Sequence, residues 1–265
     1  MADHMIKDFH PRFIFFDLDG TLVSHSIHDV PDSTRQAISQ LQDKGIPCAL
    51  ATGRHMKELE KLPGHDIPFD AYVMMNGQMI HNKDRALIDG LTFKEKNLDS
   101  ILDIFHRKEI PIEIMEENRV YINFVNRHVI ETLGDVSTEA PVEMLYEGGD
   151  IFMAVCFIEE KDERRLKDML PDCRITRWHP GGVDIISKGG GKAQGIRRFL
   201  AGRQIDLSDV IVFGDSENDV DMLKAAGLGI AMGNGTPDAI EAADYVTDSV
   251  DEDGIYKALQ HFHIL

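Results

Sequence analysis

The chain has 265 residues, of which 43% are hydrophobic, and this composition is typical of a globular protein rather than a disordered one. Its formal net charge of -18 argues against nucleic acid or an anionic membrane as a partner. The three cysteines lack a C-x-x-C spacing, and the chain has neither a membrane-length apolar stretch nor a signal-peptide pattern, so we expect a cytoplasmic protein.

The first third of the chain alternates short apolar runs with helical patterns. Residues 13–16 form an uninterrupted apolar run that predicts a buried strand, and the runs at 48–51 and 72–75 predict two more. Helical patterns at 32–44 and 56–62 separate these strands. An order of strand, helix and strand is typical of parallel βαβ units.

The middle of the chain, residues 82–187, has a different character. Helices are expected at 98–107 and 162–170. Strands are expected more densely around them, at 112–115, 120–125, 142–145, 151–157, 174–178 and 183–186. Runs of strands with a helix between them favour an α+β module with a largely antiparallel sheet. We therefore predict that this segment is a separate domain inserted into the first one.

The last third, residues 188–265, returns to the alternation of the first. The predicted elements are a helix at 192–200, a strand at 210–213, a helix at 218–226, a strand at 228–231, and helices at 237–243 and 254–261. Together with residues 1–81 they predict an α/β fold, with a doubly wound, Rossmann-like parallel sheet as the core and residues 82–187 as an inserted α+β cap.

Polar clusters follow four of the predicted core strands, at the points where these strands end. They are Asp17/Asp19/Thr21, Thr52/Gly53/Arg54, Asn76/Gly77 and Gly214/Asp215/Asn218/Asp219. Ligand sites in open α/β sheets form at the carboxyl ends of the strands. A helix cap explains one acidic cluster of this kind well and four together poorly. We therefore expect an active site along this edge.

The first cluster indicates a metal. Residues i and i+2 of an extended chain point to the same side, so Asp17 and Asp19 face one pocket. Two carboxylates at the end of a buried strand are costly unless a cation offsets their charge. The pattern predicts a Mg2+ site that Asp215 completes. Asp17 is also a candidate nucleophile, and Asp19 a candidate proton donor and acceptor.

Phosphoryl transfer is the chemistry that these residues favour. Asp17 would attack phosphorus and become an aspartyl phosphate. Thr52 would offer a neutral hydroxyl to the phosphoryl group, and Lys192 would supply the positive charge that the acidic chain lacks. Lys188, on the other side of the glycines at 189–191, is the weaker candidate for that cationic role.

The remaining polar residues at the strand ends complete the predicted binding site. Gly53 and Asn76 are expected to line it, and Asn218 would help to fix Asp17 or the phosphate. Asp219 would hold metal-bound water. Two readings of Arg54 stay open, because it could grip a substrate phosphate or sugar hydroxyl, or pair with an acid in the core domain.

The four clusters resemble the motifs of the haloacid dehalogenase-like superfamily of phosphotransferases. The D-x-D-G-T motif matches residues 17–21, Thr52 ends the second strand, Lys192 matches the motif lysine, and G-D-x-x-N-D matches residues 214–219. The run at 52–54, the Asn-Gly pair and the large insertion are similar to the Cof-type subfamily, whose members carry a large α/β cap of type IIB. The resemblance implies that the backbone carbonyl of Asp19 completes the metal shell with Asp17 and Asp215.

We therefore expect a Mg2+-dependent phosphatase that acts on small phosphomonoesters, with sugar phosphates favoured, as a monomer or small homo-oligomer. The inserted domain would select the substrate and exclude water from the site. Two alternatives stay open. One is a hexose phosphomutase of the same fold, which needs a longer-lived aspartyl phosphate. The other is a non-catalytic, Mg2+-dependent module that binds a phosphorylated ligand.

Overall fold

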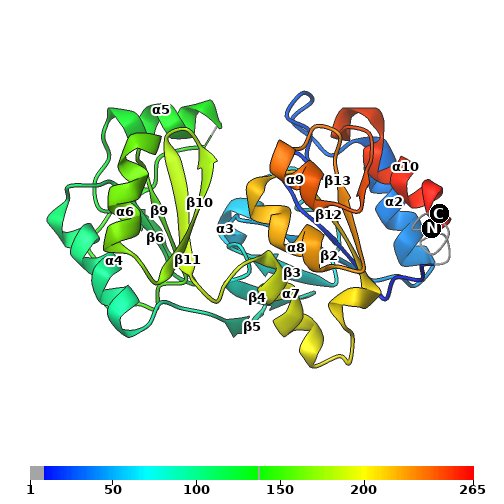
Figure 1. Cartoon of the computed structure of the whole chain (residues 1–265), viewed down its shortest axis with the longest axis horizontal. Coiled ribbons are helices and arrows are strands. Elements are labelled where there is room, and N and C mark those ends of the chain that lie inside the picture. The colour runs from blue at the N-terminus through cyan, green and yellow to red at the C-terminus, as the bar shows by residue number, and fades with distance from the viewer. Residues whose placement is uncertain (1–8, 137) are drawn as a thin grey trace. The chain divides into compact units, whose positions relative to one another are not determined.

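The computed structural model describes residues 9–136 and 138–265, which form two compact units (Figure 1). Unit 1 contains the chain up to Asp89 together with Gly191–Leu265, and unit 2 contains Gly90–Gly190. Unit 2 is thus an insertion between two parts of unit 1. In the described part of the chain, none of the helices has the length and apolar character that a membrane span requires.

Unit 1 is built on an eight-stranded sheet with the order β14-β13-β12-β1-β2-β3-β4-β5. The strands are β1 (Phe13–Phe16), β2 (Cys48–Ala51), β3 (Ala71–Met74), β4 (Met79–Asn82), β5 (Leu87–Gly90), β12 (Val210–Gly214), β13 (Leu228–Ala231) and β14 (Tyr245–Val246). All neighbours from β14 to β3 are parallel, and β4 runs antiparallel to β3. The predicted doubly wound parallel sheet is confirmed.

The order of the strands creates a ligand-binding edge. The chain begins in the middle of the sheet with β1 and adds β2 and β3 on one side. It returns from unit 2 to add β12, β13 and β14 on the other side. Loops that leave the carboxyl ends of strands on either side of such a switch point diverge and leave room for a ligand. In this chain the switch point is the end of β1.

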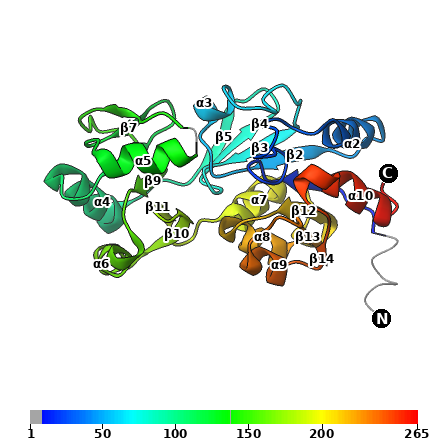
Figure 2. The same ribbon diagram turned by 90° about the horizontal axis from the view of Figure 1, so that it is seen from above.

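Helices cover both faces of this sheet. One layer contains α7 (Lys192–Ala201), α8 (Val220–Ala225) and α9 (Pro237–Ala242), and α2 (Asp32–Asp43) and α10 (Gly254–His261) lie side by side on the opposite face (Figures 1 and 2). The inner strands are therefore buried on both sides, which explains their uninterrupted apolar runs. The short helix α3 (Met56–Leu59) follows β2.

The core between the sheet and α7 fixes the position of that helix. The ring of Phe199 on α7 packs edge-on against Phe13 and Phe15 of β1, with ring centroids 5.3 and 6.1 Å apart. Burying one such apolar side chain contributes roughly 1.5–3 kcal/mol. Glycines allow a close approach at the other end of the helix, because a Cβ on Gly77 would lie 2.2 Å from the carbonyl oxygen of Gly191. The start of α7 is thereby held against the end of β3.

Unit 2 is an α+β domain, as the dense strands of the middle segment predicted. Its six-stranded sheet has the order β10-β11-β9-β6-β7-β8, and every pair is antiparallel except β7–β8. Apolar side chains of α4 and α6 share one core with its inner strands. The elements are α4 (Glu95–Arg107), β6 (Ile112–Met115), β7 (Val120–Ile122), α5 (Arg127–Asp135), β8 (Val142–Glu143), β9 (Met153–Cys156), α6 (Glu163–Met169), β10 (Cys173–His179) and β11 (Gly182–Ser187).

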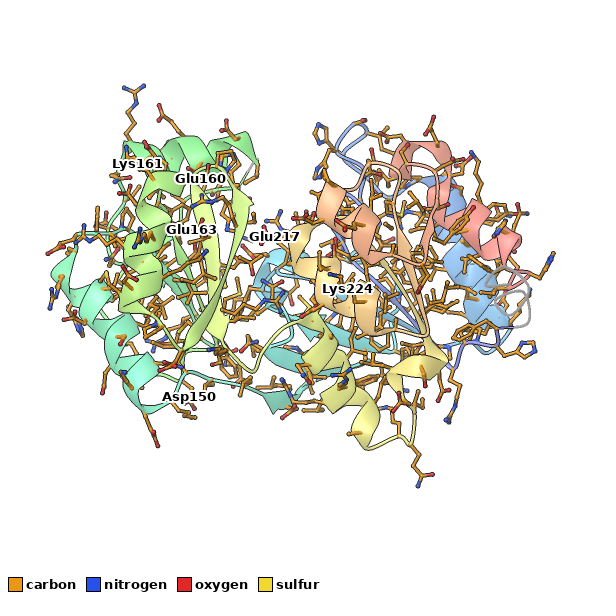
Figure 3. All side chains as sticks on the ribbon, in the orientation of Figure 1. Asp150, Glu160, Lys161, Glu163, Glu217 and Lys224 are labelled. Atoms are coloured by element: carbon orange, nitrogen blue, oxygen red, sulfur yellow. The ribbon has the colours of Figure 1, made fainter. Side chains whose placement is uncertain are left out.

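In unit 2, one polar contact joins helix α6 to the sheet, and another determines where strand β7 ends. The Arg177 Nε on β10 donates a hydrogen bond of 3.0 Å to Glu163 at the start of α6 (Figure 3). The predicted strand at 120–125 ends early, at Ile122, because the Asn123 side chain accepts the N–H groups of Ile112 and Phe124. This side chain takes the place of a continuing strand partner.

Some elements differ from the sequence-based expectation. The sequence predicts that the insertion begins at residue 82, whereas β4 and β5 belong to the sheet of unit 1, which continues to Asp89. Helix α5 was not predicted, although the Asn126 side chain caps it by accepting the Val129 N–H. The expected helix at 218–226 is a 3-10 turn, η3 (Glu217–Asp219), followed by α8.

Candidate active site

Asp17 and Asp215 lie side by side because the strands that precede them are parallel neighbours. Phe16 of β1 is paired in register with Phe213 of β12, and the Asp17 N–H continues the ladder to the Phe213 carbonyl oxygen at 3.0 Å. Both carboxylates are buried, with 5% of Asp17 and 8% of Asp215 exposed. The switch point of the sheet therefore carries two acids in close contact.

The loop after Asp17 passes directly against Asp215. Gly20 adopts a φ of +81°, and a Cβ at this position would lie 2.5 Å from the Asp215 Oδ2. Only glycine combines this backbone angle with this close approach. The next residue, Thr21, donates its hydroxyl to the Asp215 Oδ1 at 3.0 Å. The G-T of the first motif thus positions the carboxylate of the fourth.

Lys192 is a fully buried cation between two carboxylates. It is the first residue of α7, and its Nζ donates to the Asp17 Oδ1 at 2.5 Å and to the Asp219 Oδ1 at 2.6 Å. Burial by itself would lower the pKa of this ammonium, but Asp17 and Asp219 raise it above its usual range. Lys192 is therefore charged, and it binds the first and fourth motifs together.

Asp219 is held by hydrogen bonds from Lys192 and from two backbone N–H groups, and its predicted contact with metal-bound water stays a prediction. It is fully buried in the η3 turn, while Glu217 at the start of the same turn is exposed (Figure 3). Its Oδ1 accepts from Lys192, and its Oδ2 accepts the N–H groups of Asp215 and Ser216, both at 2.9 Å. Asp219 therefore anchors the lysine and shapes the loop that presents Asp215.

The site carries more negative than positive charge. Asp17, Asp215 and Asp219 each offer one carboxylate oxygen, and these three atoms all lie within 4.8 Å of one another. When all three carboxylates are ionised, the single ammonium of Lys192 leaves an excess of two negative charges among these four groups. Buried oxygen ligands with such an excess fit a hard divalent cation such as Mg2+.

The pKa values of the carboxyl groups reflect this crowding. Burial raises the pKa of Asp17 well above its usual range, and the charges of Asp219 and Asp215 raise it further, against the opposing effect of Lys192. Burial and Asp219 raise the pKa of Asp215 to about 6, although the Thr21 hydrogen bond opposes this shift. Protons and a metal ion therefore compete for the same oxygens near neutral pH.

Arg54 pairs with an acid, which is one of the two readings that its sequence position allowed. Its Nε donates to the Asp19 Oδ2 at 2.9 Å and its Nη2 to the Asp19 Oδ1 at 3.0 Å. Burial by itself would lower the pKa of this guanidinium, but Asp19 raises it. Both oxygens of Asp19 accept from Arg54, and each keeps a second lone pair through which Asp19 can exchange a proton with a substrate.

The remaining predicted residues meet at the ends of β2 and β3. Thr52 is buried, and its hydroxyl oxygen accepts the Arg54 N–H at 3.1 Å. The Asn218 Nδ2 donates to the Asn76 Oδ1 at 2.9 Å, and a Cβ on Gly53 would lie 3.3 Å from the same oxygen. Asn218 thus bonds to Asn76 in this structure, and its predicted role in fixing Asp17 or the phosphate stays a prediction.

Two residues that contact the site were missed from the sequence. Ser216 donates its hydroxyl to the Asp215 Oδ2 at 3.1 Å, and Asn234 donates to the carbonyl oxygen of Gly20 at 2.8 Å. Asn234 follows β13, so it too lies just beyond the end of a parallel strand. Ligand sites form at the carboxyl ends of parallel strands, and a search for polar residues after every core strand would therefore have found Asn234 as well.

Known proteins with similar sequences and structures point to one family. The family model for haloacid dehalogenase-like hydrolases matches residues 14–259. The Bacillus subtilis protein YkrA is 31% identical over 257 residues, which cover 96% of this chain and 98% of YkrA. The solved structure of the phosphatase BT1666 from Bacteroides thetaiotaomicron aligns with a TM-score of 0.88 and 29% identity, covering 97% of this chain and 96% of that one. The subclass IIB sugar phosphatase BT4131 aligns with a TM-score of 0.84 and 32% identity, covering 96% of this chain and all of that one, 100%.

Proposed function

Because the chain belongs to the haloacid dehalogenase-like hydrolase family and is a phosphoric monoester hydrolase, we propose that it is a Mg2+-dependent phosphatase of small phosphomonoesters that works through an aspartyl phosphate on Asp17. The family membership, including the Cof-type subfamily, is what the four sequence motifs predicted. The observation that carries the proposal is the buried group of Asp17, Asp215 and Asp219 around the ammonium of Lys192.

Asp17 is the proposed nucleophile because it is the buried carboxylate at the switch point of the sheet. One of its oxygens forms a bond to phosphorus while the ester P–O bond breaks. Lys192 holds the Asp17 carboxylate in one orientation and offsets its charge, which allows an anionic phosphate to approach. Mg2+, held by Asp17, Asp215 and the backbone carbonyl of Asp19, would offset the charges of the carboxylates and the phosphate together.

Asp19 is the proposed proton carrier. It protonates the leaving oxygen, and in the second step it takes a proton from the water that attacks the aspartyl phosphate and frees Asp17. Both Asp19 oxygens accept from Arg54 in this structure, which orients the carboxyl group and leaves each oxygen a lone pair for the proton. Thr52, Gly53, Asn76 and Asn218 are the proposed binding residues for the phosphate and the nearby part of the substrate.

We also propose that unit 2 is the substrate-specificity domain. In that role a domain of this size, inserted between the second and third motifs, would limit access to the nucleophile and so favour small metabolites over protein substrates. Sugar phosphates are the favoured class, since the similar structure BT4131 is a sugar phosphatase.

A panel of sugar and nucleotide phosphates tests the proposed function. We expect inorganic phosphate to be released from at least one sugar phosphate in the presence of Mg2+, and EDTA to abolish this release until Mg2+ is restored. Conversion of a 1-phosphate to a 6-phosphate without free phosphate would instead support a phosphomutase. Tight binding of one ester with no turnover of any would support a binding module.

The affinity for Mg2+ is expected to depend on pH. The pKa of Asp215 is about 6, and its carboxylate must be ionised to bind a cation, so protons displace the metal as the pH falls through this value. One pH unit below this pKa only about a tenth of the Asp215 carboxyl groups are ionised, and the raised pKa of Asp17 adds to the effect, so we expect the affinity at pH 5 to be at least about tenfold weaker than at pH 7. Calorimetric titrations with MgCl2 at pH 5, 6, 7 and 8 measure this, and equal affinities at pH 5 and pH 8 would contradict it.

A further inference from the structure

Asn234 joins three segments of unit 1 that are far apart in the sequence. It lies in the loop between β13 and α9. Its Nδ2 donates to the carbonyl oxygen of Gly20 at 2.8 Å, and its Oδ1 accepts the Val250 N–H at 2.9 Å. Val250 begins the 3-10 helix η4 (Val250–Glu252). One amide side chain therefore holds the loop after Asp19 against the carboxyl-terminal part of the core.

The loop that carries Asn234 also contacts Asp215. The Thr236 N–H donates to the backbone carbonyl oxygen of Asp215 at 2.7 Å. Between these residues, a Cβ on Gly235 would lie 3.1 Å from the same Asp215 oxygen. Residues 234–236 therefore touch both the loop of the first motif and the backbone of the fourth.

The hydrogen bond from Asn234 to Gly20 fixes the peptide group that joins Gly20 to Thr21, the residue that contacts Asp215. The Gly20 carbonyl shares a rigid peptide plane with the Thr21 N–H, and the Thr21 hydroxyl donates to the Asp215 carboxylate. The Gly20 N–H shares the other plane with the Asp19 carbonyl, and it donates to the Val23 carbonyl oxygen at 2.9 Å. With one bond on each plane, the segment from Asp19 to Thr21 has a single orientation beside Asp215.

We propose that Asn234 is a positioning residue for the metal site, which it serves by orienting the Gly20–Thr21 peptide against Asp215. This inference rests on the Mg2+ site of the proposed function. Asn234 itself is exposed, so its truncation removes two hydrogen bonds and leaves no cavity in the core. Its loss should therefore change the metal site more than the stability of the fold.

Calorimetric titration of the metal-free protein with MgCl2 tests this role. The dissociation constant of Asn234→Ala is expected to be about 2- to 10-fold higher than that of the wild type, the span for the loss of one net hydrogen bond. At saturating Mg2+, kcat and the KM for substrate should approach the wild-type values. Asn82→Ala is the matched control, because it removes an amide that accepts the Asp84 and Ala86 N–H groups in the β4–β5 hairpin, and its Mg2+ constant should not change.

A double-mutant cycle with Thr21→Val tests whether Asn234 acts on the metal site through the Thr21 hydroxyl. If Asn234 acts through the Thr21 hydroxyl, then Asn234→Ala raises the Mg2+ constant less in the Thr21→Val protein than in the wild type. If the effects of the two substitutions on the dissociation constant for Mg2+ were fully additive, action through the Thr21 hydroxyl would be overturned. If Asn234→Ala and the wild type had equal dissociation constants for Mg2+, the positioning role would be overturned. A wild-type protein that binds no Mg2+ would overturn the proposed metal site itself, so the two failures are distinguishable.

Discussion

The Asp17→Asn variant is expected to lose phosphatase activity by at least about 10⁴-fold, the loss seen when a residue of a nucleophilic catalytic group is removed. An amide oxygen cannot form the aspartyl phosphate, although it fills the same space as the carboxylate. Steady-state assays of phosphate release with the best substrate of the panel measure this loss. A variant that keeps substantial turnover would refute Asp17 as the nucleophile.

The fold of Asp17→Asn is expected to remain intact. Lys192 keeps its 2.6 Å bond to Asp219 in this variant, so no buried charge is left without a partner. Thermal unfolding in EDTA should therefore resemble that of the wild type, while the stabilisation by added Mg2+ should be smaller because one carboxylate ligand is gone. Asp43→Asn, on the exposed side of α2, is the control that carries the same chemical change and should keep both activity and Mg2+ stabilisation.

The Lys192→Met variant is expected to lose both activity and stability. Without the ammonium, Asp17 and Asp219 remain buried as two facing carboxylates, and an uncompensated buried charge of this kind destabilises a fold by about 3–5 kcal/mol. Activity should fall by about 10²- to 10³-fold or more, because the charge that steadies the nucleophile and the phosphate is missing. Denaturant titrations in EDTA and phosphate-release assays measure the two effects.

The loss of stability in Lys192→Met should shrink as the pH falls. The pKa of the Lys192 ammonium is raised in the folded protein, so its stabilising contribution is fully present at pH 8 and below, and all of it is lost on substitution. Lys192 lowers the pKa of Asp17 in the wild type, so its loss raises this pKa further, and the folded variant regains more stability on acidification than the wild type does. A difference from the wild type that is as large at pH 5 as at pH 8 would contradict the proposed charge balance.

Lys188→Met is the control that shows whether the losses of activity and stability in Lys192→Met are specific to Lys192 or follow from any lysine substitution in this segment. Lys188 is exposed and lies four residues before Lys192, on the other side of the glycines. Because it has water around it in both the folded and unfolded states, we expect its substitution to change stability little. If Lys188→Met lost as much activity as Lys192→Met, this result would contradict the assignment of Lys192 as the catalytic cation.

The predicted sheet and its ligand-binding edge follow from local patterns. A parallel strand covered by helices on both faces must be apolar throughout, so β1, β2, β12 and β13 appear as short uninterrupted apolar runs. The polar residues after these runs are brought to one edge by the topology alone. For the same reason Asp17 and Asp215 could be placed together, although 198 positions separate their numbers in the chain.

What the local patterns could not decide is which polar atoms pair with each other. Arg54 could grip a substrate or an acid, and only the approach of the β1 and β2 loops selects Asp19. Lys192 could meet the phosphate directly, whereas the packing of α7 on the sheet buries it between two carboxylates. These choices depend on the separation of loops within about an ångström, because hydrogen bonds form only over roughly 2.5–3.2 Å.

The sequence by itself thus determined the fold class, the family and most of the polar residues that meet at the carboxyl edge of the sheet, since burial and strand ends leave periodic and local traces in the chain. The tertiary structure decided the partners of Arg54, Asp219, Asn218 and Asn234, and the membership of β4 and β5 in the core sheet. Except for the Asp215 N–H that Asp219 accepts, these partners come from other segments of the chain, and the distance between the segments is set by how the helices and the sheet pack, which no local pattern records.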